Sequence, residues 1–220
     1  MHPSPRWPVL GLFGFLALLL IGWLLPVSAA DLLHWGAGLS SSRAMLTGLV
    51  IAMALLMSFG LPGSLIFWFI APFHAPWISV LLLLTGSTGG ALGAYVLGRR
   101  LGERWRPKGY ARQLLALLSA RSDFMTQCAL RILPGFPHAF INLSGGILRL
   151  PLGPFLSAAV IGLAIKWGVY AQAAHGMVNA AQADEVLNIQ TLWPLVLIAV
   201  LMIAGALARR FWFKADKRKT

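Results

Sequence analysis

Residues 44–98 read AMLTGLVIAMALLMSFGLPGSLIFWFIAPFHAPWISVLLLLTGSTGGALGAYVLG, and none of these 55 positions is Asp, Glu, Lys or Arg. A second stretch, residues 186–208, runs for 23 positions without a charge. Apolar runs of about 18 residues or more are candidates for membrane spans. The chain of 220 residues is 58% hydrophobic and 11% charged, whereas soluble domains carry about 25% charged residues. The composition predicts an integral membrane protein and excludes a soluble enzyme, a disulfide-rich secreted scaffold and a disordered chain.

The basic residues lie beside the apolar runs. The net charge is +12, from 18 Lys and Arg against 6 Asp and Glu, and thirteen of the bases fall in residues 99–121 and 209–220. Lys and Arg concentrate in cytoplasmic loops, so we expect both segments in the cytoplasm, next to anionic lipid headgroups. No aromatic-basic module accompanies the charge, so nucleic acid is not an expected partner.

The amino-terminal segment holds a third apolar run at residues 9–27, preceded by Arg6. We interpret it as a retained helix that starts in the cytoplasm and leaves residues 28–43 outside. Both termini are then cytoplasmic. The alternative is a secretory signal peptide, because Val27-Ser28-Ala29-Ala30 resembles a cleavage site; residues 1–29 would then be removed.

The number of crossings between the external residues 28–43 and the cytoplasmic residues 99–121 must be odd. Prolines divide the apolar stretch between them into two long pieces, and two spans would return the chain to the wrong side. The sequence therefore predicts a re-entrant hairpin over 44–74 and one full span over 76–98. The hairpin tip is expected at Gly60-Leu61-Pro62-Gly63, because Gly permits a sharp turn and Pro removes a backbone donor.

The same count applies downstream. Residues 176–190 carry two acids and no base, so they are expected outside. The sequence then predicts a second re-entrant hairpin over 123–150, broken at Pro134-Gly135-Phe136-Pro137. Residues 154–175 form the following span, and residues 191–208 return the chain to the cytoplasm.

The two hairpins share a sequence pattern, since Leu-Pro-Gly occurs at residues 61–63 and again at 133–135. They enter from opposite faces, which is the layout of a transporter built as an inverted repeat, so Gly63 and Gly135 are expected to approach each other near mid-bilayer. The expected fold class is an all-α integral membrane protein, with an inverted repeat of two re-entrant hairpins plus about four transmembrane helices. The alternative is that Pro and Gly only kink ordinary spanning helices.

Two cations are expected inside the membrane. Residues 124–183 contain Arg131 and Lys166 but no Asp or Glu. An intramembrane charge costs about 2.5–3.5 kcal/mol on insertion scales and marks a candidate site. Arg131 is expected near the midplane, where its planar fork suits a phosphate; the alternative is a clamp on carbonyls at the Pro-broken tip. Lys166 lies midway along its span and either contacts an anion or packs against freed carbonyls.

Other polar side chains in the second half have simpler interpretations. Asn142 is expected to bridge the two hairpin arms, Arg149 to extend toward the membrane surface, His138 to be solvated near the tip, and Cys128 to fill space as a small apolar group. One span carries an overlapping GxxxG pattern that permits close approach, either within the chain or to a second copy in a homo-oligomer. Its members are Gly86, Gly89, Gly90 and Gly93.

Two blocks of these residues resemble the VTT domain of the DedA superfamily, also called the SNARE-associated Golgi protein family. One block is Leu61-Pro62-Gly63-Ser64-Leu65, with the glycines of 86–93 behind it. The other, more specific block is Arg131-x-x-Pro134-x-x-Pro137, followed by Asn142-x-x-x-Gly146. The resemblance covers residues 59–176 and implies paired re-entrant hairpins. We expect three parts: an N-terminal helix and external loop at 1–43, this core at 44–178, and a C-terminal helix and basic tail at 179–220.

The resemblance implies a protein that moves lipids between leaflets, polyprenyl-phosphate carriers in bacteria or phospholipids in eukaryotes. We therefore expect a flippase or scramblase for an anionic, phosphate-bearing lipid, located in a bacterial inner membrane. Many bacterial relatives place an acid where this chain has Ser64, and a second Arg where it has Pro137-His138, so proton coupling through paired carboxylates is not implied. The expected substrate-binding residues are Arg131, Pro134, Asn142, Lys166, Pro62, Gly63 and Gly135.

Two other functions stay open. One is a non-transporting membrane assembly or homeostasis factor, in which a neutral substitution of Arg131 would be tolerated. The other is an intramembrane serine hydrolase using Ser144 and His175, although Asn142 occupies the first Gly position of the turn that such an enzyme needs. No residue cluster predicts a metal, a cofactor or a carboxylate pair for acid–base chemistry, so an enzyme is not expected.

Overall fold

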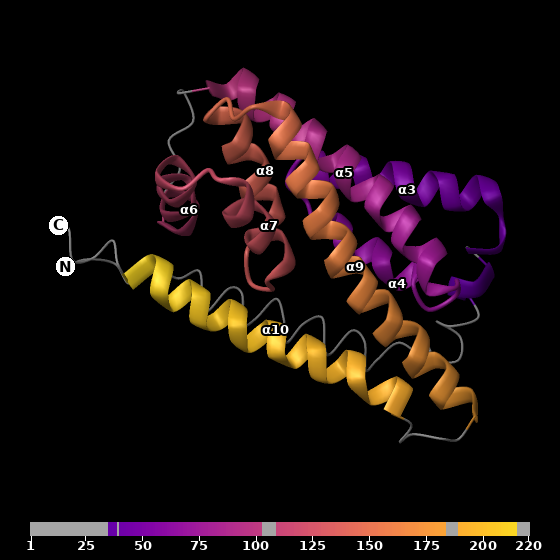
Figure 1. The fold of residues 1–220 in the computed structure, drawn as a ribbon. Helices are drawn as coiled ribbons and strands as arrows, with labels where there is room; N and C mark the ends of the chain where they lie inside the picture. The colour runs from indigo at the N-terminus through magenta and orange to yellow at the C-terminus, as the bar shows by residue number, and fades with distance from the viewer. Residues whose placement is uncertain (1–34, 39, 103–108, 184–188, 215–220) are drawn as a thin grey trace, which may run out of the picture.

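The computed structural model describes residues 35–38, 40–102, 109–183 and 189–214 (Figure 1). These residues form helices and turns and no strand, which confirms the all-helical class. The principal helices, in chain order, are α3 (Arg43–Ser58), the short 3₁₀ helix η1 (Gly63–Ile66), α4 (Phe67–Ile70), α5 (Pro76–Leu101), α6 (Gly109–Ala120), α7 (Phe124–Ile132), α8 (His138–Ile147), α9 (Leu152–Ala183) and α10 (Ile189–Lys214).

Three helices in this part of the chain are long and apolar enough to cross a membrane: Pro76–Leu101, Leu152–Val178 and Leu192–Trp212. They coincide with the spans that the sequence predicts after each proline-marked break, and those predictions are confirmed as candidate spans. The predicted first helix at 9–27 lies outside the described residues.

Local chemistry sets the ends of α5. Pro76 occupies the first turn, where its missing N–H costs nothing. Arg99 and Arg100 lie in the last turn, where their charge complements the helix dipole. Gly102 then adopts a positive φ of 53° and donates its backbone N–H to the carbonyl of Gly98, which closes the helix.

Both predicted breaks are turns. The chain leaves α3 at Ser58, and Gly60 supplies a φ of 80° that a residue with a side chain rarely adopts. Gly63 then lies against Met53 and Met57, so the chain folds back on α3. In the second turn Gly135 has a φ of 90°, and it separates the nine residues of α7 from the ten of α8.

Helix α5 lies at the centre of the fold, with α3, α8 and α9 packed against it (Figure 1). Helix α7 packs on α9, whereas its neighbour in sequence, α8, packs on α5. The two arms of the second turn therefore diverge onto different long helices. Helix α10 contacts α9 near the C-terminal end of α9, and the two helices diverge from there (Figure 1).

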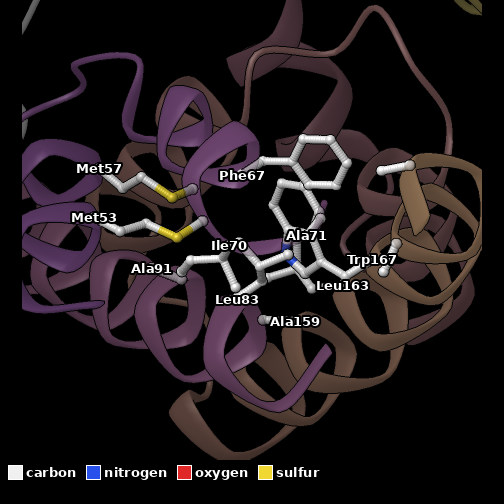
Figure 2. Close-up of a cluster of buried hydrophobic side chains, with 12 residues drawn as sticks. Met53, Met57, Phe67, Ile70, Ala71, Leu83, Ala91, Ala159, Leu163 and Trp167 are labelled. Atoms are coloured by element: carbon white, nitrogen blue, oxygen red, sulfur yellow. The ribbon is translucent and has the colours of Figure 1, made fainter. Parts of the chain in front are cut away.

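One apolar core joins the first half of the chain to α9 (Figure 2). The ring of Phe67 stacks on that of Trp167 with centroids 5.7 Å apart, and the indole N–H of Trp167 donates to Ser87 Oγ at 3.1 Å. The hydroxyl of Ser87 donates in turn to the carbonyl of Leu83 at 2.6 Å, so the buried polar groups of this contact are paired. The other fully or nearly fully buried members are Met53, Met57, Ile70, Ala71, Ala91, Ala159, Leu163, Ala171 and Ala174.

The glycines on α5 allow another helix of the same chain to pack closely against it. A Cβ added at Gly86 would lie 3.0 Å from Met53 Sδ, and one at Gly90 would lie 2.5 Å from Met57 Cβ. A Cβ at Gly93 would collide with Ser58. These neighbours all belong to α3, so in this structure α3 covers the face that the sequence also offered to a second copy.

The two turns face each other, but through other residues than the sequence predicts. The sequence expects Gly63 and Gly135 to meet, whereas Gly63 is buried against α3 and a Cβ at Gly135 would have no neighbour within 4 Å. Instead, a Cβ on Gly60 would lie 3.7 Å from that of Ala139. The expectation fails because the chain folds back at Gly60, three residues before Gly63.

A disulfide is expected to form between cysteines introduced at positions 60 and 139, in a Cys128→Ala background. The separation of 3.7 Å matches the mean Cβ–Cβ distance of disulfides, about 3.8 Å. Oxidation should therefore cross-link the turns within one chain, detected by peptide mapping, despite about 1–3 kcal/mol of strain at position 60. The control pair is Gly60→Cys with Gly153→Cys, because position 153 has no neighbour within 4 Å. Equal cross-linking of both pairs would contradict this arrangement of the turns.

Candidate functional site

Arg131 lies in the last turn of α7 and has no solvent-accessible surface. Its Nη1 donates to the carbonyl of Gln127 at 3.0 Å, and its Nη2 donates to Asn142 Oδ1 on α8 at 3.5 Å. Its guanidinium carbon lies 4.7 Å from the centre of the Phe155 ring on α9. Arg131 Nε has no hydrogen-bond partner among the described residues.

These contacts join three helices at one side chain. Helix α7 also approaches α9 closely at Gly162, where a Cβ would lie 2.9 Å from that of Arg131. Because the arms α7 and α8 diverge, the Arg131–Asn142 contact bridges them, as the sequence predicts for Asn142. The contacts favour the clamp among the two roles left open for Arg131, since Nη1 and Nη2 both donate to acceptors of the two arms.

The described part of the chain offers no counter-ion to Arg131 or to Lys166, the second cation that the sequence predicts in the site. Its only acid is Asp123, the N-cap of α7, which accepts from the Thr126 backbone N–H at 2.9 Å and from the Thr126 hydroxyl at 2.8 Å. The backbone hydrogen bond, and to a smaller extent the side-chain one, holds the pKa of the Asp123 carboxyl below its usual value. Asp123 starts α7, and Arg131 lies two turns further along it.

Lys166 and His138 form the second polar contact of the site. Lys166 Nζ on α9 lies 2.7 Å from His138 Nε2 at the start of α8. The ammonium also lies 5.2 Å from the ring centre of Trp167 and 5.7 Å from that of Tyr170, within the range of cation–π attraction. The sequence expects His138 to be solvated; that expectation is wrong, because α9 brings Lys166 against its ring.

Lys166 lines an apolar cavity of about 330 Å³. The wall combines aromatic side chains from α4 and α9 with aliphatic ones from α10, and Lys166 is its only charged residue among those that the structure describes. The lining residues are Ser64, Leu65, Phe67, Trp68, Lys166, Trp167, Tyr170, Ala173, Ala174, Met177, Leu195 and Ile198.

A second cavity of about 350 Å³ lies between the two turns. It contains two of the predicted site residues, Pro62 and Gly63, and also His138. Ser64 lines both cavities, and the Lys166–His138 contact joins a residue of one lining to a residue of the other. The second lining consists of Met57, Gly60, Leu61, Pro62, Gly63, Ser64, Phe136, Pro137, His138 and Ala139.

The predicted site residues therefore fall into two groups. Arg131 and Asn142 contact each other and line neither cavity. Lys166 lines the first cavity, and Pro62 and Gly63 line the second. Pro134 belongs to neither lining; its carbonyl faces Gly205 of α10. Gly135 shapes the second turn through its positive φ. Sequence reasoning missed the aromatic wall, whose signal was four aromatic residues in two short stretches: Phe67, Trp68, Trp167 and Tyr170.

Ser144 and His175, the two residues of the hydrolase alternative, do not form a hydrogen-bonded catalytic pair. Ser144 Oγ and His175 Nδ1 are both buried, and neither has a hydrogen-bond partner among the described residues. A serine nucleophile needs a base within hydrogen-bond reach. The same residues contain no group of three or more His, Cys, Asp or Glu side chains placed to hold a metal ion.

Arg131→Gln is expected to destabilise the protein by about 1–3 kcal/mol, because it removes the contact with Phe155 and leaves buried acceptors unpaired. If the protein translocates lipid, as the sequence predicts, the translocation rate per folded molecule should stay near the wild-type value. Melting temperature and translocation are measured on the same purified sample, with the exposed Arg149→Gln as the matched control. Normal stability with a tenfold lower translocation rate would place Arg131 on the path of the lipid instead.

The fold and its apolar surfaces define an all-helical integral membrane protein with three candidate spans in the described residues. The model of the VTT domain matches residues 44–176, and the chain belongs to this family, the VTT/DedA family. No solved structure matches the chain.

Three curated relatives are similar to the chain. A transmembrane protein 41 homolog of Caenorhabditis elegans is 24% identical over 76% of this chain and 70% of its own length. Transmembrane protein 41B of Gallus gallus is 25% identical over 70% and 60%, respectively. An uncharacterized membrane protein of Arabidopsis thaliana is 28% identical over 59% of this chain and 47% of its own length. The chain thus spans between about half and 70% of the length of these relatives.

Proposed function

We propose that the protein moves a phosphate-bearing lipid between the two leaflets of its membrane, as a flippase or scramblase. The observation that carries the proposal is an apolar cavity with one cation in its wall, Lys166, and no acid near it in the described chain. Ligand cavities are mostly apolar with a few placed polar groups. An acyl chain suits the aromatic and aliphatic wall, and a phosphate suits the ammonium. Membership of the VTT family is consistent with a lipid-related function.

The two turns are proposed to be re-entrant hairpins related as an inverted repeat. Helices α7 and α8 have nine and ten residues, so they are about 14 and 15 Å long. The hydrocarbon core is about 30 Å thick, and neither helix alone is long enough to cross it. The meeting of the turns at Gly60 and Ala139 supports the same arrangement, because hairpins from opposite faces meet at their tips.

The orientation is proposed from the positions of the bases. Arg99 and Arg100 end α5, and Arg209 and Arg210 lie near the end of α10. The positive-inside rule assigns both ends to the cytoplasm. The chain then enters α9 from the cytoplasm and re-emerges after α10, which is consistent with a bacterial inner membrane and cytoplasmic termini.

Reconstitution tests this function. The full chain is inserted into vesicles containing a trace of fluorescent phosphatidylglycerol, fluorescent polyprenyl phosphate, or a neutral fluorescent diacylglycerol. Accessibility to an external quencher then reports translocation. We expect faster exchange of one or both phosphate-bearing probes than in protein-free vesicles. Unchanged exchange of both phosphate-bearing probes would instead favour a non-transporting assembly or homeostasis factor.

A further inference from the structure

The Lys166–His138 contact brings together two basic groups that cannot both be charged and hydrogen-bonded to each other. A hydrogen bond between Nζ and Nε2 at 2.7 Å needs one nitrogen to donate and the other to accept through a free lone pair. A protonated histidine ring and an ammonium are both donors only. The pair in this structure therefore holds one positive charge, most simply an ammonium donating to a neutral imidazole.

The surroundings of the pair oppose a second proton. Helix α7 contributes another cation, Arg131, which adds positive potential at His138. Helix α9 contributes the neutral phenol of Tyr170, and α10 presents Leu195 and Ile198 to the cavity. The short helix η1 presents Ser64, whose hydroxyl carries no charge. The described residues place no carboxylate beside the pair, because Asp123 is at the far end of α7.

An anion in the cavity reverses this balance. A phosphate that accepts from the ammonium supplies the negative charge that the site lacks, and an opposite charge within about 4–6 Å favours the protonated form of a histidine. His138 Nε2, released from Lys166, then takes one proton from water and becomes a second donor to the phosphate.

We propose that the Lys166–His138 pair binds a phosphate-bearing headgroup together with one proton, which is taken up on His138 Nε2. The inference rests on the proposed function, because it concerns the same cation, Lys166, and the histidine that contacts it from the second cavity. The balance is one phosphodiester anion plus one proton from the aqueous phase, so the ligand moves with no net charge. Coupling is reciprocal: if the anion favours protonation of His138, protonation favours the anion.

The linkage has a defined direction. The bound state holds one more proton than the free state, so affinity is highest at low pH and weakens as the pH rises. While His138 is protonated in the complex and neutral in the free protein, the loss is up to about tenfold in affinity per pH unit. The proton adds a charge-assisted hydrogen bond to the bound phosphate.

Calorimetry on the purified full chain in detergent tests the inference. The probe is dioctanoyl phosphatidylglycerol, because a phosphodiester has no titrating proton near neutral pH, unlike a phosphate monoester with a second pKa of about 6. Titrations at several pH values, each in two buffers with different ionisation heats, report the protons taken up. We expect uptake approaching one proton per bound lipid, and affinity that falls as the pH rises.

Two histidine variants assign the proton. His138→Gln should bind with no proton uptake and with affinity independent of pH. His74→Gln is the matched control and should behave as the wild type, because His74 bonds to the carbonyl of Ile70 and lines neither cavity. The wild-type measurement needs no variant, so the inference is tested even if His138→Gln does not fold.

The outcomes separate the two proposals. Binding of the probe by the wild type with no proton uptake overturns the coupling and leaves the proposed function standing. Uptake that persists in His138→Gln overturns the assignment to His138. A wild-type protein that neither binds the probe nor translocates fluorescent lipid overturns the proposed function itself.

Discussion

Replacing Lys166 with glutamine is expected to lower the translocation rate of a phosphate-bearing lipid by roughly ten- to hundredfold. Lys166 is the only charged side chain that the described residues contribute to the lining of its cavity, and a hydrogen bond to a charged group contributes about 1.5–3 kcal/mol. Each 1.4 kcal/mol is a factor of about ten. Glutamine keeps a donor near the same position but removes the charge that attracts the phosphate. The rate is measured with fluorescent phosphatidylglycerol in vesicles.

Two further variants sharpen this test. Lys166→Arg keeps the charge and should retain more of the rate than Lys166→Gln. Arg149→Gln removes an exposed cation outside both cavities and should leave the rate within about twofold of wild type. A Lys166→Gln protein that folds and moves the lipid at the wild-type rate would exclude Lys166 from the binding site.

Gly146→Leu is expected to destabilise the fold by about 3 kcal/mol or more, and so to deplete the folded protein. Helices α5 and α8 touch backbone to backbone at this point: a Cβ at Gly146 would overlap the carbonyl of Tyr95 and lie 2.8 Å from the backbone nitrogen of Arg99. Overpacking in a core costs about 1–3 kcal/mol even where side chains can shift. Here the obstacle is backbone, so the helices must separate. Thermal unfolding in detergent measures the loss.

The matched control for this variant is Gly168→Leu on α9. A Cβ at Gly168 has no neighbour within 4 Å, so the larger side chain has space. It should change stability by less than about 1 kcal/mol, because leucine also has the better helix propensity. Equal destabilisation by both substitutions would show that the close α5–α8 contact is not the cause.

The sequence could predict the long helices and the turns because both depend on local composition. A long apolar run with few or no charges is identifiable without any knowledge of its neighbours, as in α5, α9 and α10. The glycines at the two Leu-Pro-Gly motifs likewise mark turns. The backbone freedom of Gly60, just before the first motif, and of Gly135, within the second, is an intrinsic property. The divergence of α7 and α8 onto different helices depends on packing between distant residues and had no local signal.

The candidate site was predictable only in part, for the same reason. Arg131 and Lys166 were identifiable singly, because a cation among apolar residues is conspicuous. Their partners were less so: His138 on α8 meets Lys166 on α9 from 28 positions away. The cavity wall combines η1, α4, α9 and α10, and no periodicity in one segment indicates such a combination.

The position of α10 has a consequence for biogenesis. It contributes Leu195 and Ile198 to the cavity, faces the Pro134 carbonyl with Gly205, and packs Trp212 on Phe136 with ring centroids 5.8 Å apart. A nascent polypeptide leaves the ribosome with its N-terminal side first, so α3 to α9 can assemble before α10 is made. Insertion of α10, after α3 to α9, thus completes the cavity wall and covers the second turn. A chain stalled before α10 would present that unfinished surface to the chaperones and proteases of membrane quality control.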